Sequence, residues 1–177
     1  MHTVLLVPVP LLEPWVRERW EHYAPTWVSR DPSFTHAHVT VLAPWAAEPS
    51  ADDLAAVAKI AAAAAPFEFM LSTVEAFADG LLHLVPAPAA PFAALTAALW
   101  ARFPEHPPYA GAFPDPVPHL TLDQASAAVS AASVRASLGT LLPATCRAER
   151  LELHRYDEGD CRVLARWPLG GPLSGRA

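Results

Sequence analysis

The stretch HVTVLAPW at residues 38–45 decides the fold, because it has the pattern of a β-strand with a polar motif on one face. Its first residues, His38-Val39-Thr40-Val41, alternate polar and aliphatic side chains. Successive side chains of a strand point to opposite faces, so the His and Thr share one face, about 7 Å apart. The two valines then point the other way, into the core.

The same motif returns in PHLTL at residues 118–122, as His119-Leu120-Thr121. Two such strands, lying side by side or related across a cleft, place two imidazoles and two hydroxyls around one space. Two imidazoles suit phosphodiester cleavage, since one can take a proton from the nucleophile while the other gives one to the leaving oxygen. The hydroxyls can donate hydrogen bonds to the phosphate oxygens. The alternative without function is a pair of core histidines beside threonines that favour strands.

The charge and hydropathy of the chain argue against some classes of binding partner. The formal charge is −6, with no basic run, which argues against DNA or a long RNA as partner because phosphate neutralisation supplies most of that affinity. The 177 residues fit one domain, and no apolar run reaches the roughly 18–20 residues that cross a bilayer. Without a basic leader before the first apolar stretch, we expect a cytoplasmic protein with no membrane partner. The Ala- and Arg-rich composition suggests a bacterial source.

The elements along the chain predict an α+β fold. Ser50 and Asp53 form a capping box for a helix that Pro66 ends, and Ser126 is expected to begin a later helix. Periodicity and turn residues predict the rest: strands at 3–9, 37–43 and 118–123, a helix after Pro14, a strand pair around Asp79-Gly80, a helix at 91–103, and a final hairpin of 146–156 and 161–167. Each half thus shows helix, motif strand, helix and strand pair, in weak support of an internal duplication.

Several side chains outside the motifs receive an assignment. The segment 104–118 is a long irregular loop with six prolines that leads directly into His119, and we interpret it as a wall of the site. Its Tyr109 and Phe113 are candidates for stacking on a base. Two free thiols, Cys146 and Cys161, are expected, since the predicted hairpin keeps them apart. The core is expected to take five tryptophans, Trp15, Trp20, Trp45, Trp100 and Trp167.

The chain resembles the 2H phosphoesterase superfamily, in its bacterial 2′-5′ RNA ligase-like, or cyclic phosphodiesterase, branch. HVTVLAPW and PHLTL carry the resemblance, and the loop before the second motif and the closing RWPLG at 166–170 support it. It implies a bilobal fold of two pseudo-symmetric antiparallel sheets, flanked by helices, with the motifs in a central cleft. Residues 1–177 then form one domain of two intertwined lobes, with 171–177 as a flexible tail.

The resemblance also implies a function. His38 and His119 would be catalytic and Thr40 and Thr121 would bind the phosphate. The implied reaction opens a 2′,3′-cyclic or 1″,2″-cyclic phosphate of a small nucleotide or an RNA end, without metal or cofactor. The alternatives are a protein on the same fold that binds a nucleotide or phosphometabolite without turnover, and a 2′-5′ RNA ligase or RNA end-processing enzyme. The sequence does not say which imidazole is acid and which is base.

His36 is the remaining candidate. It precedes His38 by two residues and shares its strand face, so the two histidines have a spacing that could place two ligands on one metal ion. Zinc needs three or four protein ligands, and no third stands at telling spacing, so we expect no metal. His36 is instead assigned to the rim of the site or to the exposed surface. The protein is expected to be a monomer.

Overall fold

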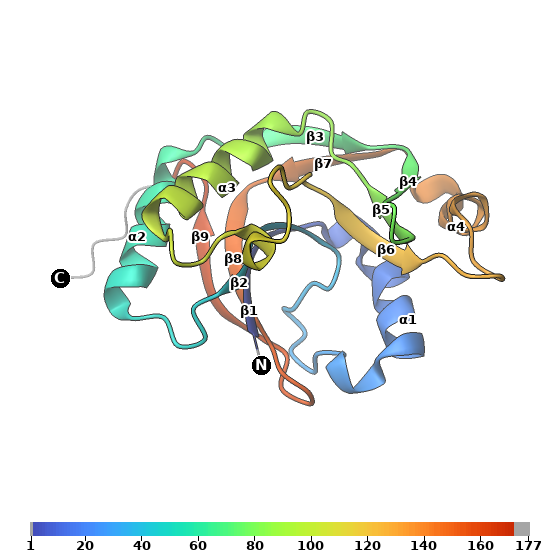
Figure 1. Ribbon diagram of the computed structural model, residues 1–177, viewed down its shortest axis with the longest axis horizontal. Helices are drawn as coiled ribbons and strands as arrows, with labels where there is room; N and C mark the ends of the chain where they lie inside the picture. Colours follow the sequence, from blue (N-terminus) through green and yellow to red (C-terminus); the bar gives the residue numbers. More distant parts are fainter. Residues whose placement is uncertain (1, 172–177) are drawn as a thin grey trace.

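The computed structural model describes residues 2–171 and is an α+β fold, as predicted (Figure 1). Its larger sheet is antiparallel, with the strand order β4-β5-β6-β2-β1-β8-β9, and a small sheet pairs β3 with β7. Helices α2 and α3 lie at one end of the molecule and α1 at the other (Figure 1). The bounds are β1 His2–Pro8, α1 Glu13–Tyr23, β2 His38–Trp45, α2 Ala51–Ala63, β3 Phe67–Leu71, β4 Val74–Ala76, β5 Leu81–Leu84, α3 Ala90–Arg102, β6 Leu120–Gln124, α4 Ala131–Leu138, β7 Ala144–Ala148, β8 Arg150–Tyr156 and β9 Arg162–Pro168.

The sheet has a twofold pattern about its two central strands. Strands β2 and β6, which carry the motifs, are neighbours and pair through Val39 and Leu120. On either side of this pair, β1 lies next to β2 as β5 lies next to β6, and β8 and β4 come next in the order. Strands β3 and β7 pair with each other in the small sheet. The internal duplication suggested by the sequence therefore has a counterpart in the strand order. The motif strands lie side by side, one of the two arrangements that the sequence left open.

The N-cap predicted from the sequence is correct for α2 and wrong for α4. At α2, the Ser50 hydroxyl accepts from the Asp53 amide and the Asp53 carboxylate accepts from the Ser50 amide, which is the predicted capping box. Helix α4 begins after Ser130, not after Ser126. The reason is that Ser130 has a polar partner three residues on, in Ser133, whereas Ser126 has Val129 there and closes a turn with it.

Each half was predicted to contain a pair of strands after its second helix, but the structure has three strands there. They are β3, β4 and β5 in the first half and β7, β8 and β9 in the second. Strand β7 separates from β8 and leaves the large sheet to pair with β3, as Phe67 opposite Ala148 to Leu71 opposite Ala144. Only β8 and β9 then form the closing hairpin, with its turn at Gly159 as predicted. The two cysteines are free, as expected. The predicted tail 171–177 lies outside the described residues, apart from its first residue.

The main core lies on the face of the sheet opposite the motif side chains. It takes in Val39, Val41 and Leu120, each at most 2% exposed, which confirms the alternation predicted for the motif strands. Trp100 is a correction, since it is 42% exposed. On α3 the positions 92, 95 and 99 form the buried stripe, which Phe103 continues just past the end of the helix. Trp100 comes directly after a residue of this stripe, so its side chain turns outward. Within 2–171, no helix is long and apolar enough to cross a membrane.

Candidate active site

The pairing of β2 with β6 brings the two motifs together. With Val39 opposite Leu120 in an antiparallel pair, His38 comes opposite Thr121 and Thr40 comes opposite His119. Because side chains alternate, all four polar side chains lie on the face away from the buried valine and leucine. Diagonal neighbours in such a pair are about 7–8 Å apart, which is close enough for both imidazoles to reach one phosphate group.

The two imidazoles are held by the same local hydrogen bond. Nδ1 of His38 lies 2.7 Å from the carbonyl oxygen of His36, and Nδ1 of His119 lies 2.8 Å from that of Val117. A carbonyl oxygen only accepts, so each Nδ1 carries the hydrogen. The neutral rings therefore keep Nε2 unprotonated, which leaves it able to accept a proton.

Burial keeps both rings neutral. It lowers the pKa of His38 to about 3, with the neighbouring His154 adding to the effect. Burial also lowers the pKa of His119, although the hydrogen bond to Val117 opposes the shift. At pH 7 both imidazoles of the free protein are thus bases rather than cations.

A cavity of about 920 Å³ opens beside the motifs. His38, Thr40 and Thr121 line it, and its volume lies at the upper end of the range of small-molecule sites, about 300–1,000 Å³. Further walls come from α1, from the short helix Pro25–Trp27, and from strands β1 and β8. These walls carry five rings, His2, Trp20, Tyr23, Trp27 and Tyr156.

The family follows from comparison with known proteins. The family model described as the 2′-5′ RNA ligase superfamily matches residues 8–160. The chain belongs to this superfamily. Among curated proteins, no sequence matches the chain.

Several solved structures have a similar fold. TT0787 of Thermus thermophilus has 21% identity and a TM-score of 0.63, over 97% of this chain and 99% of its own. E. coli LigT complexed with 3′-AMP has 17% identity and a TM-score of 0.57, over 95% and 97% of the two chains. A structure described as a phosphoesterase has 16% identity and a TM-score of 0.56, over 95% and 97%. At these identities the likeness shows the fold alone.

In this member of the 2′-5′ RNA ligase superfamily, the loop 104–118 lies against the second motif. The ring of Tyr109 is nearly parallel to that of His119, with centroids 6.1 Å apart, and Phe113 meets Tyr109 edge-on at 5.7 Å. Tyr109 and the following Ala110 adopt left-handed backbone angles, with φ of 51° and 53°, which are costly for residues with a Cβ. Neither ring lines the large cavity; Tyr109 lines a separate space of about 10 Å³.

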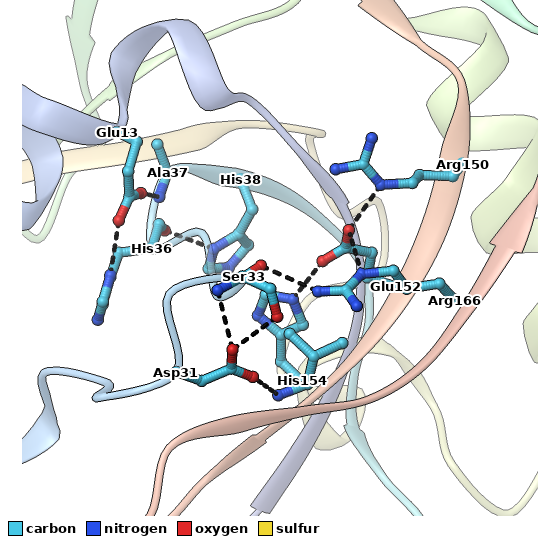
Figure 2. A network of polar contacts seen from close by, with 11 residues as sticks. Glu13, Asp31, Ser33, His36, Ala37, His38, Arg150, Glu152, His154 and Arg166 are labelled. Carbon is cyan, nitrogen blue, oxygen red and sulfur yellow. Dashed lines mark hydrogen bonds and ion pairs between the residues drawn. The ribbon is translucent and has the colours of Figure 1, made fainter.

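His36 lines the large cavity but is buried rather than exposed. It is 2% exposed, its Nδ1 lies 2.8 Å from Oε1 of Glu13, and its Nε2 accepts from the Ser29 amide at 3.2 Å. The second oxygen of Glu13 accepts from the Ala37 amide, so this carboxylate anchors the start of β2 to α1 (Figure 2). His36 therefore holds the strand that carries His38. Within residues 2–171, no group of three or more His, Cys, Asp or Glu side chains is placed to hold a metal.

Two more histidines lie on strands on either side of the motif strands. His83 on β5 pairs with Thr121 in register, meets the His119 ring edge-on at 5.5 Å, and stacks on Phe77 at 3.7 Å. His154 on β8 is fully buried, and its Nε2 lies 2.6 Å from Oε2 of Glu152 (Figure 2). A mid-strand histidine carries no sequence signal that distinguishes these neighbours from a solvated residue.

The cavity holds little positive charge. Of the arginines in the described part of the chain, Arg19 alone lines it, and its Nη1 lies 3.8 Å from Oδ2 of Asp123. Since Asp123 also lines the cavity, the two charges offset one another. The site lacks the basic track that a bound polynucleotide backbone calls for.

Proposed function

We propose that this protein is a metal-independent phosphodiesterase that opens the 2′,3′-cyclic, or 1″,2″-cyclic, phosphate of a small nucleotide. The observation that carries the proposal is the pairing of Val39 with Leu120, which brings two histidines and two threonines with matching geometry to one face. A chance pair of core histidines would have no reason to face each other's threonine across two paired strands.

The mechanism assigns each side chain a step. Nε2 of His38 takes a proton from water as its oxygen attacks phosphorus, and the bond from phosphorus to one ring oxygen breaks. That oxygen takes a proton from the imidazolium of His119, giving a phosphate monoester. The hydroxyls of Thr40 and Thr121 donate to the non-bridging oxygens, whose charge grows in the transition state. His38 is assigned the role of base because its lower pKa keeps it neutral, and the bound anion favours the charged form of His119.

A small nucleotide is favoured over a long RNA. The lining of the cavity is nearly neutral, with Arg19 paired to Asp123, so it suits a substrate with one phosphate at the motifs. Structures of similar fold include E. coli LigT complexed with 3′-AMP, with ATP and with NADP+, which are nucleotides. The free thiols of Cys146 and Cys161 are in keeping with a reducing compartment such as the cytoplasm.

The test is turnover of a panel of 2′,3′-cyclic nucleotides with EDTA present. We expect wild type to open them, and His38→Ala and His119→Ala each to lose about 10²- to 10⁴-fold, the usual contribution of a general acid or base. His106→Ala, in the loop before the second motif, is the matched control and should keep wild-type rates. If nucleotides bind without turnover and both variants weaken that binding, the protein is a binding module and the enzymatic proposal is wrong.

A further inference from the structure

Two groups of rings flank the motif pair, and they differ in the room beside them. On the His119 side stand Tyr109 and Phe113, which the sequence marked as candidates to stack on a base. On the His38 side stand five rings, which we call the aromatic compartment: His2, Trp20, Tyr23, Trp27 and Tyr156. We infer that the aromatic compartment binds the nucleobase of the substrate, an inference that rests on the proposed function.

The aromatic compartment begins next to His38 and continues outward. The ring of Tyr156 lies 6.2 Å from that of His38. His2 stacks on Tyr156 at 5.4 Å with the planes 8° apart, and Trp27 follows at 6.4 Å from His2. Trp20 lies 5.9 Å from Tyr156 on another side. A substrate whose phosphate sits at the motifs thus has aromatic surface within the reach of one sugar ring.

Volume decides between the two sides. The aromatic compartment opens on the cavity of about 920 Å³, whereas the space beside Tyr109 is about 10 Å³. A single water needs about 10–15 Å³, so the smaller space has no room for a base. We therefore place the base in the aromatic compartment rather than beside the other candidates, Tyr109 and Phe113.

Charge and rigidity favour a neutral flat ring over a second phosphate. Among the described residues, Arg19 is the arginine that lines the cavity, and it faces the carboxylate of Asp123. Trp27 sits on a helical turn whose Thr26 carbonyl accepts from the Gly159 amide at 2.7 Å, so the turn is tied to the β8–β9 hairpin. Rings fixed in this way stack on a base with little loss of side-chain freedom, and such stacking does not depend on the identity of the base.

The test compares a nucleotide with the same molecule lacking its base. Binding of a nucleoside 3′-monophosphate and of ribose 3-phosphate is measured by calorimetry for wild type, Trp27→Leu and Tyr23→Ser. Tyr23 is 57% exposed, so its variant is expected to fold even if Trp27→Leu does not. We expect the Kd of the nucleotide to rise about 5- to 150-fold in Trp27→Leu, as for loss of one stacking contact, with no change for ribose 3-phosphate. Turnover of the matching cyclic phosphates should show the same contrast in KM.

Two control variants complete the comparison. Phe113→Leu removes a ring on the other side, and Trp100→Leu removes an exposed tryptophan of α3; both should bind the nucleotide as wild type does. The inference is overturned if Phe113→Leu weakens nucleotide binding while both compartment variants leave it unchanged, if ribose 3-phosphate is affected equally, or if wild type binds neither compound. Absence of turnover with base-dependent binding intact would count against the proposed function and leave the aromatic compartment standing.

Discussion

Glu152→Gln should destabilise the protein by an amount that depends on pH. The Glu152 carboxylate is fully buried on β8, where it accepts from Arg150 Nε at 2.6 Å, Arg166 Nε at 3.1 Å and His154 Nε2 at 2.6 Å (Figure 2). Burial alone raises the pKa of this carboxyl, but the hydrogen bonds from His154 and Arg150 outweigh it and hold the pKa at about 2, against the ordinary 4.5 of a glutamate. Burial lowers the pKa of His154, so a neutral imidazole donates to the carboxylate.

The pKa difference sets the size of the effect. Each unit corresponds to about 1.36 kcal/mol, so the folded-state preference for ionised Glu152 contributes about 3 kcal/mol at pH 7. A depressed carboxyl pKa gives stability that is fully present above pH 4.5 and is lost as the pH falls through about 2. At pH 3 about 1.4 kcal/mol should remain. Arg150 and Arg166 are partly exposed, so water can solvate them when the carboxylate is removed, and the larger cost of stranding a buried cation does not apply.

Urea denaturation at pH 7 and pH 3 measures this contribution. The free energy of unfolding of wild type should exceed that of Glu152→Gln by about 3 kcal/mol at pH 7 and by about half of that at pH 3. Glu149→Gln is the matched control, because this exposed glutamate lies 3.5 Å from Arg147 at the surface and should matter by less than about 1 kcal/mol at both pH values. An equal difference between wild type and Glu152→Gln at the two pH values would refute the reasoning.

The remaining predictions concern the motifs. Thr40→Val and Thr121→Val keep the shape of the side chain and lose the hydroxyl, so each should lower kcat/KM by about 10- to 150-fold, as for one hydrogen bond to a charged group, while the melting temperature barely changes; wild-type rates would remove the threonines from the phosphate site. The pH profile of kcat/KM should rise through the pKa of His38, about 3, and fall through that of His119, which lies below 6.5. An optimum above pH 7 would contradict the neutral imidazoles of the free enzyme.

Features that depend on neighbouring residues could be predicted from the sequence. The α2 capping box needs only Ser50 and Asp53, three residues apart, and the buried side of each motif strand follows from alternation alone. The four motif side chains could be chosen as site candidates because two histidines can transfer protons and two threonines can donate hydrogen bonds to a phosphate. That β2 and β6 pair directly could not be predicted, since the long segment between them contains other strands able to pair.

The aromatic compartment was missed for the same physical reason. His2, the segment at 20–27 and Tyr156 come from three distant parts of the chain, and only the order β2-β1-β8 brings them together. Tyr109 and Phe113 were the sequence's candidates for stacking on a base because they lie in the loop that leads into the second motif. Nearness along the chain brought the Tyr109 ring beside His119, yet the space that Tyr109 lines is only about 10 Å³.

Because the fold has a twofold pattern, the difference between the two ends of the site comes from the segments that surround the motifs and not from the motifs themselves. Two equal motifs on paired central strands present equivalent histidines, and nothing in the pairing itself makes one the base. The covering segments differ, since Tyr156 of β8 lies 6.2 Å from His38 beside the large cavity, while the loop 104–118 places Tyr109 over His119. Unequal burial lowers the pKa of His38 to about 3, and the large cavity opens on that side. On the proposed mechanism, the same asymmetry that selects the base catalyst therefore also fixes the end of the site at which the nucleobase binds.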